Sequence, residues 1–112
     1  MSTALTYAIK FVQDMDAAVR FHREQLGLKL RFQTPGWAEF ETGPTTLALH
    51  LSSPENPAGT CQLGFRVPDI EGFYSTAKGQ GVEFTNPPTD VHGHKVAKFL
   101  DQDGAQGSVS GD

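Results

Sequence analysis

Short runs of alternating apolar and polar residues follow one another along this chain, and a helix-like spacing interrupts them twice. The run at 7–12 is strand-like, and Asp14 after it can accept hydrogen bonds from the free N–H groups at the start of a helix. Apolar residues then recur every three or four positions up to Leu26, and Gly27 can adopt the left-handed conformation that ends helices. The pattern predicts a helix over 15–26.

Three strand-like runs follow this helix, and the pattern then restarts. Turn dipeptides of proline and glycine separate the three runs, which cover residues 28–33, 37–42 and 45–51. After a polar stretch with hardly any apolar residue, the same order returns: a strand-like run, an aspartate at the start of a helix, an apolar stripe and further strands. These predictions fall at 61–67, Asp69, Ile70 to Ala77, 94–101 and 106–110.

The two halves also match residue by residue. Residues 14–27 align with 69–81 across a one-residue gap, and Ala-Glu-Phe at 38–40 aligns with Ala-Lys-Phe at 97–99. Such self-similarity is typical of a duplicated structural unit. We therefore predict an α+β fold in one domain, 1–112, with two βαβββ modules: module one at 1–52, a linker at 53–60 and module two at 61–112.

Composition and charge exclude several partners. The formal net charge is −4, and the nine Lys and Arg residues never form a dense block, so nucleic acid is not an expected partner. No apolar run approaches the roughly 20 residues of a membrane helix, and the N-terminus lacks a secretory pattern, which predicts a cytoplasmic protein without a membrane partner. The single cysteine, Cys61, is expected to be a small, partly buried apolar residue.

Several segments carry a family resemblance. Residues 7–14, Phe21-His22 and Leu26-Gly27-Leu28 resemble the opening of glyoxalase/bleomycin-resistance/dioxygenase (vicinal oxygen chelate) proteins, and residues 99–104 resemble their closing strand and turn. This resemblance implies that the two modules form a curled sheet with a cleft, and that the helices lie outside it. It also implies that metal-dependent members take ligands from four strand positions.

Those four ligand positions align here with Tyr7, Ala48, Gln62 and Ser108. A catalytic divalent ion would need converging imidazole and carboxylate donors, which a phenol, a methyl group, an amide and a hydroxyl do not supply. The resemblance therefore favours the metal-free binding proteins of the superfamily, and we expect no metal and no other cofactor.

Strand alternation extends this comparison to the residues expected to line the cleft, because side chains two positions apart share a face. Trp37 could instead seal the core or contact a second subunit, and for Arg66 a salt bridge to Glu39 or Glu41 is favoured over catalysis. Ala38 and Phe40 are assigned to the face that packs against the helix. The predicted ligand-binding set is Tyr7, Phe11, Trp37, Glu39, His50, Gln62, Arg66 and Ser108.

The histidines leave alternatives open. His50 lies on a predicted strand and could be a hydrogen-bond partner, a general base near neutral pH, or a strand residue without a function. His92 and His94 fall in a predicted loop after Asn86-Pro87-Pro88 and are either solvated or form an atypical metal site with His50. His22, on the first helix, is interpreted as structural.

The leading functional hypothesis is a metal-free protein that sequesters or carries a planar or cationic organic molecule, as resistance-type relatives do. The alternative is a lyase, isomerase or dioxygenase acting on a small oxygenated substrate, which would use His50 or Arg66 or a metal held by displaced ligands. A regulatory or assembly subunit without a small ligand is a third possibility. We also expect a homodimer, because 112 residues can hardly cover the sheet edges and apolar strand faces.

Overall fold

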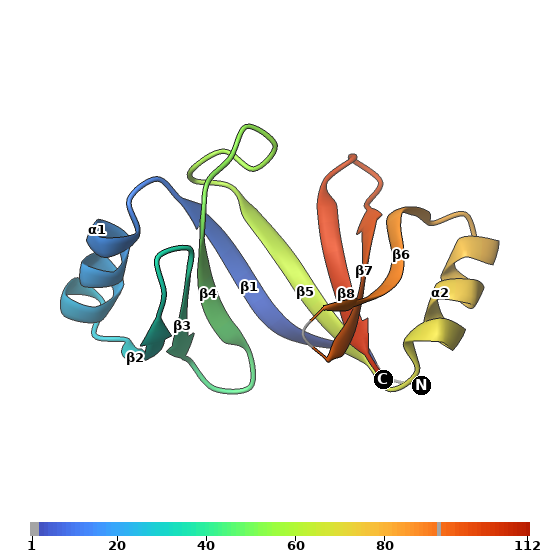
Figure 1. The fold of residues 1–112 in the computed structure, drawn as a ribbon, viewed down its shortest axis with the longest axis horizontal. Helices are drawn as coiled ribbons and strands as arrows, with labels where there is room; N and C mark the ends of the chain where they lie inside the picture. The colour runs from blue at the N-terminus through green and yellow to red at the C-terminus, as the bar shows by residue number, and fades with distance from the viewer. Residues whose placement is uncertain (1–2, 92) are drawn as a thin grey trace. The chain divides into compact units, whose positions relative to one another are not determined.

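The computed structural model describes residues 3–91 and 93–112, which form two compact units. The first unit contains residues 6–61, and the second contains residues 3–5 with 62–112. The elements are β1 (Ala4–Val12), α1 (Met15–Arg20), a π-helical turn (Phe21–Gln25), β2 (Lys29–Gln33), β3 (Trp37–Glu41), β4 (Thr46–Leu51), β5 (Cys61–Val67), α2 (Ile70–Gly79), β6 (Glu83–Val91), β7 (His94–Leu100) and β8 (Gln106–Gly111) (Figure 1). The α+β class with two βαβββ modules is confirmed.

The two units share one strand arrangement. The order is β2-β3-β4-β1 in the first unit and β5-β8-β7-β6 in the second. The pairs β1–β4 and β5–β8 are parallel, and the remaining pairs in each unit are antiparallel. The registers also agree, because Ala48 lies opposite Ile9 and Ser108 lies opposite Gly64. Positions in one unit can therefore be matched with positions in the other.

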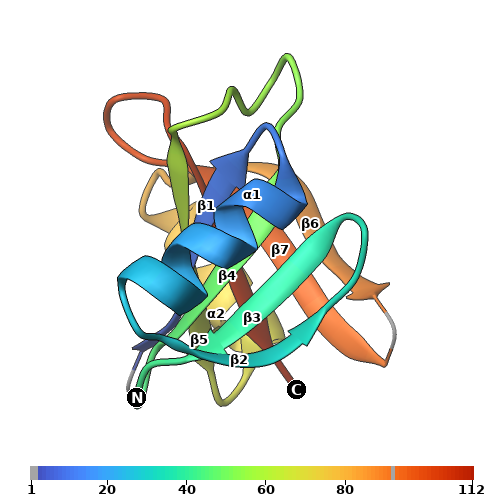
Figure 2. The ribbon, with the colours of Figure 1, turned by 90° about the vertical axis from the view of Figure 1, so that its left-hand side faces the viewer.

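The helix α1 covers one face of the first unit's strands (Figure 2). The Asp14 carboxylate accepts a hydrogen bond from the Ala17 amide at 3.1 Å, which caps the helix as predicted. Val19 packs with Phe40 and Leu49 in the core, and the last two are completely buried. The assignment of Ala38 and Phe40 to the helix-packing face is confirmed.

The second unit uses the same construction. The Asp69 carboxylate accepts from the Gly72 amide at 3.1 Å at the start of α2. The buried core contains Val67, Ile70, Ala97 and Val109, with several partly buried phenylalanines packed around it. In the described part of the chain, neither helix is long and apolar enough to cross a membrane.

The one-residue gap in the sequence repeat corresponds to the π-helical turn. The Leu26 amide donates to the Phe21 carbonyl, five residues back, whereas the Gln80 amide donates to the Thr76 carbonyl, four residues back. An inserted residue is accommodated in a helix as such a widened turn. Beyond it the two units realign, because Leu28 donates to the His22 carbonyl as Val82 donates to the Ala77 carbonyl. His22 and Ala77 therefore occupy equivalent positions.

The predicted loop does not start at Asn86-Pro87-Pro88, because β6 runs from Glu83 to Val91 and includes these residues, and Gly93 lies in the turn before β7. Proline cannot donate to a sheet ladder, but it is tolerated on edge strands and at bulges. Both conditions hold here, since β6 is an edge strand and its register shifts on either side of Asn86. His94 opens β7, and His92 lies outside the described residues.

Candidate functional site

A row of polar and aromatic side chains lies on the face of the first unit's sheet opposite α1. His50 of β4 is the register partner of both Phe11 on β1 and Trp37 on β3. In the next row on this face Ala48 lies between Ile9 and Glu39, and Tyr7 is paired with Thr46 beyond it. Five of the eight predicted ligand-binding residues thus share one surface: Tyr7, Phe11, Trp37, Glu39 and His50.

The Glu39 carboxylate is the centre of this surface. Its Oε2 atom accepts from Trp37 Nε1 at 2.9 Å and from the Tyr7 hydroxyl at 3.4 Å, while Oε1 accepts from Arg31 at 3.0 Å. Glu39 is 8% exposed, so its charge is largely withdrawn from water. Burial, followed by the nearby Glu39 charge and hydrogen bond, raises the pKa of the Tyr7 hydroxyl above 10.0. Tyr7 therefore stays protonated and donates to Glu39.

Arg31 is a site residue that the sequence analysis missed. Its guanidinium pairs with Glu39 and also donates to the Thr46 hydroxyl at 3.4 Å. The register shift between Leu30 and Phe32 breaks the regular alternation on β2, so alternation alone does not assign the face of Arg31. The sequence did contain one indication of this role. Arg31 lies on the strand next to the one that carries Glu39, and Glu39 was assigned to the cleft.

The His50 ring contacts two aromatic neighbours. The centroid of the His50 ring lies 5.4 Å from that of Phe11 and 5.8 Å from that of Trp37, and the rings of His50 and Trp37 are arranged edge to face. The His50 Nδ1 atom is 2.7 Å from the Leu51 carbonyl oxygen. A carbonyl only accepts, so Nδ1 carries the proton and Nε2 of the neutral ring is left with a lone pair. His50 is exposed, and this lone pair is available to a ligand or a transferable proton.

The other three predicted site residues belong to the second unit. Ser108 lies opposite Gly64, and Arg66 lies opposite Ser110. Gln62 is buried, whereas Arg66 is exposed. By register, the counterparts of Trp37, Glu39 and His50 are Val96, Lys98 and Ser110. These counterparts provide neither a carboxylate nor an aromatic ring.

Arg66, Glu39 and Glu41 each form an ion pair within their own unit, and Cys61 differs from its predicted burial. Arg66 lies 3.4 Å from the Asp112 carboxylate in its own unit, while Glu39 pairs with Arg31 and Glu41 pairs with Lys29. Each partner lies on or directly after a neighbouring strand, and the sequence alone did not reveal which strands are neighbours. Cys61 is exposed rather than partly buried, because it is the first residue of β5.

The residues at the family's metal-ligand positions do not fit a divalent ion. Ala48 has no donor atom, and the Tyr7 hydroxyl donates its proton to Glu39 with a raised pKa. Over residues 3–91 and 93–112, no group of three or more His, Cys, Asp and Glu side chains could hold a metal. The proposed cluster of His50, His92 and His94 includes a residue outside these ranges and is not tested.

Comparison with known proteins agrees with this architecture. The family model described as Glyoxalase/Bleomycin resistance protein/Dioxygenase superfamily matches residues 4–106. The chain belongs to this superfamily. No curated protein matches it significantly.

Solved structures of the superfamily fold are similar along the whole chain. A hypothetical protein from Bacillus halodurans is 22% identical with a TM-score of 0.84, and the match covers 100% of this chain and 96% of that one. Streptomyces coelicolor methylmalonyl-CoA epimerase, solved as a variant with 2-nitronate-propionyl-CoA, is 16% identical with a TM-score of 0.80 and coverages of 99% and 96%. A superfamily member from Vibrio splendidus is 13% identical with a TM-score of 0.74 and coverages of 99% and 100%. At these identities the likeness shows the fold alone.

Proposed function

We propose that this superfamily member binds a planar organic molecule without a metal ion, as a sequestration or resistance-type protein, on the sheet face that carries Trp37, Glu39 and His50. The observation that carries the proposal is the buried Glu39 carboxylate held by Trp37, Tyr7 and Arg31. Small-molecule sites typically combine aromatic walls with a few fixed polar groups. The hydrogen bonds fix the Trp37 ring before any ligand arrives, which lowers the ordering cost of binding.

The charge balance selects among ligands. The 3.0 Å contact with Arg31 compensates the Glu39 charge, so this face does not present an unpaired anion to a cationic ligand. The Trp37 and His50 rings offer stacking surfaces, and His50 Nε2 can accept a hydrogen bond. These features favour a flat aromatic or heteroaromatic compound with a donor group over a compact cation.

The single tryptophan provides the test. A panel of flat aromatic compounds should include a binder that changes Trp37 emission, and His50→Ala should weaken its binding about three- to tenfold, the value of one aromatic contact. Ser110→Ala, the register counterpart in the second unit, should leave binding unchanged. A confirmed binder that leaves Trp37 emission unchanged, or tolerates His50→Ala, would contradict the proposal.

An enzymatic function is a second candidate, favoured by the orientation of His50. With Nδ1 held by the Leu51 carbonyl, Nε2 can act as a general base on a small oxygenated substrate. Deuterium exchange at the α-carbon of small carbonyl compounds, followed by proton NMR in heavy water, tests this function. Exchange that is lost in His50→Gln would establish catalysis and reject a purely binding role.

We further propose that the chain acts as a cytoplasmic homodimer with no nucleic-acid partner. Phe21, Leu26 and Phe32 of the first unit are each more than 40% exposed, which supports a covered apolar surface. Light scattering at micromolar concentration should give twice the 12.1 kDa mass of one chain. A species of 12.1 kDa would reject the dimer.

A further inference from the structure

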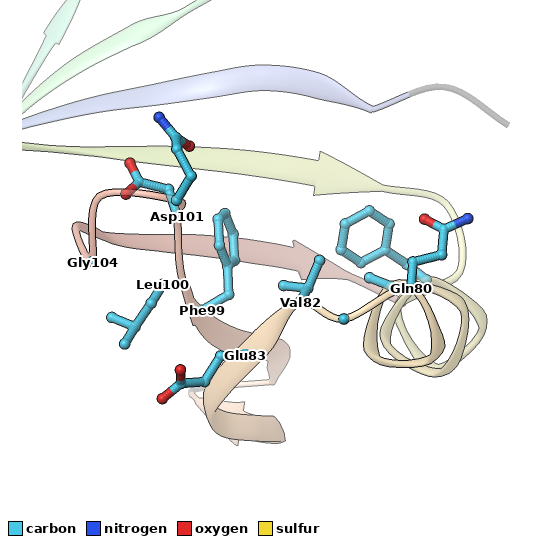
Figure 3. Close-up of a pocket in the computed structure, with 11 residues that line it drawn as sticks. Gln80, Val82, Glu83, Phe99, Leu100, Asp101 and Gly104 are labelled. Carbon is cyan, nitrogen blue, oxygen red and sulfur yellow. The ribbon is translucent and has the colours of Figure 1, made fainter.

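The second unit contains a pocket of about 640 Å³ that is not part of the Glu39 surface. Its lining comes from the end of α2, the start of β6 and the turn between β7 and β8 (Figure 3). Phe99 and Ala77 contribute to it; Phe99 packs against the core of this unit, and Ala77 is a buried residue of α2. The pocket is therefore on the helix side of the sheet, whereas the Glu39 surface is on the side away from its helix.

Comparison with the first unit explains why space remains here. His22 is buried in the first unit, where its Nδ1 bonds the Ala18 carbonyl at 2.8 Å and its ring lies 5.7 Å from Phe40. The equivalent pair in the second unit is Ala77 and Phe99. An imidazole that fills the first unit is thus reduced to a methyl group in the second.

A second difference between the units adds no space, because the Phe99 ring covers it. Leu47 is the register partner of Phe40, and Gly107 is the register partner of Phe99. The Phe99 ring lies over this glycine, since an added Cβ would come within 2.6 Å of Phe99 Cζ. Phe73 replaces the smaller Ala18 on the helix and returns part of the lost volume, yet the pocket remains. More than half of the lining residues are exposed, so a ligand can enter the pocket from solvent.

The lining indicates the charge of an occupant. Among the described lining residues Glu83 and Asp101 are the charged ones, and none is basic. Asp101 Oδ1 already accepts from the amides of Asp103 and Ala105, so Glu83 is the carboxylate expected to attract a cation. Both carboxylates are exposed, while Phe73 and Phe99 provide aromatic surface deeper in the pocket. A flat ring with a cationic substituent would match both parts through stacking and charge attraction.

We propose that this pocket is a second ligand site, which accepts a small aromatic cation whose ring takes the place that His22 fills in the first unit. The pocket volume lies within the range of small-molecule sites. This site is separate from the sheet face assigned above and does not depend on that proposal.

Benzamidinium is a suitable probe, and nitrogen–proton NMR of the whole chain is the measurement. Saturable shifts should appear in the amides of residues 77–83 and 99–104 at millimolar probe. Ala77→His should abolish them, because it restores the imidazole of the first unit. His50→Ala should leave them unchanged. Absence of saturable shifts in the native chain, or their persistence in Ala77→His, would overturn the proposal.

A milder substitution covers the case in which Ala77→His does not fold. Glu83→Gln changes an exposed side chain and should weaken benzamidinium binding about two- to fivefold, the value of an exposed charge pair. Binding of the uncharged analogue benzyl alcohol should not change. Equal affinity of benzamidinium for the native chain and Glu83→Gln would reject the role of charge in this site.

Discussion

The first and second units have the same framework but different side chains on both faces of their sheets. In the first unit His22 is buried on the helix side, and on the other side Glu39 accepts a hydrogen bond from Trp37, whose ring contacts His50. In the second unit Ala77 is the counterpart of His22, and a pocket lies beside it. The helix caps and the strand register are the same in both units, and the chemistry proposed for ligand binding lies at positions where the repeats differ.

The largest expected effect separates the two cores. Phe40→Ala removes a completely buried ring and should lower the free energy of unfolding by about 3–5 kcal/mol. Phe99→Ala removes a partly buried ring beside an existing pocket and should cost less, about 1–3 kcal/mol. Urea unfolding followed by circular dichroism measures both variants. Equal losses would show that the pocket is not a real difference between the units.

The caps should behave alike, because they belong to the shared framework. Asp14→Ala and Asp69→Ala each remove a carboxylate that accepts one helix-start amide at 3.1 Å. Each should reduce the free energy of unfolding by about 1 kcal/mol, and Asp→Asn at either position should restore most of it. If either alanine variant kept the full free energy of unfolding, tertiary packing rather than the cap would fix the start of that helix.

Most of the fold followed from local signals in the sequence. The two aspartate caps, the glycine at 27 with φ of 73° and the alternating strands predicted both modules. The strand β6 was missed because its prolines are allowed only by its edge position and its bulges, which are tertiary facts. Alternation also brought Trp37, Glu39 and His50 onto one face, but a bulge concealed Arg31.

A smaller effect concerns the Tyr7 hydroxyl. The folded chain holds this proton more tightly than the unfolded chain, so the associated stability is complete below pH 10.0 and is lost as the pH rises through the higher folded-state pKa. Glu39→Gln should lower the pKa of Tyr7, because it removes the nearby negative charge while Arg31 remains. Burial, the largest cause of the increase, is retained.

The matching measurement is ultraviolet titration of tyrosinate in a Tyr74→Phe background, where Tyr7 is the one remaining tyrosine. Arg31→Gln should move the pKa in the opposite direction, since that guanidinium lowers it. If neither Glu39→Gln nor Arg31→Gln changed the pKa of Tyr7, the interaction of Tyr7 with Glu39 would be rejected.

Metal removal should have no effect. Ala48 and Tyr7 cannot serve as ligands at the family positions, so chelator treatment should leave the thermal midpoint and ligand binding as they were. Elemental analysis of untagged protein checks this directly. Stoichiometric metal that disappears in His50→Ala or His94→Ala would replace the metal-free account with a displaced-ligand enzyme.

We propose that the ligand surface belongs to the first unit and not to its counterpart in the second. Nitrogen–proton NMR with the aromatic compound that alters Trp37 emission tests it most directly. We expect shifts of the Trp37 indole N–H and of the His50 amide, with the counterpart amides of Val96 and Ser110 unaffected. Shifts at Val96 and Ser110 with an unchanged Trp37 indole signal would contradict it.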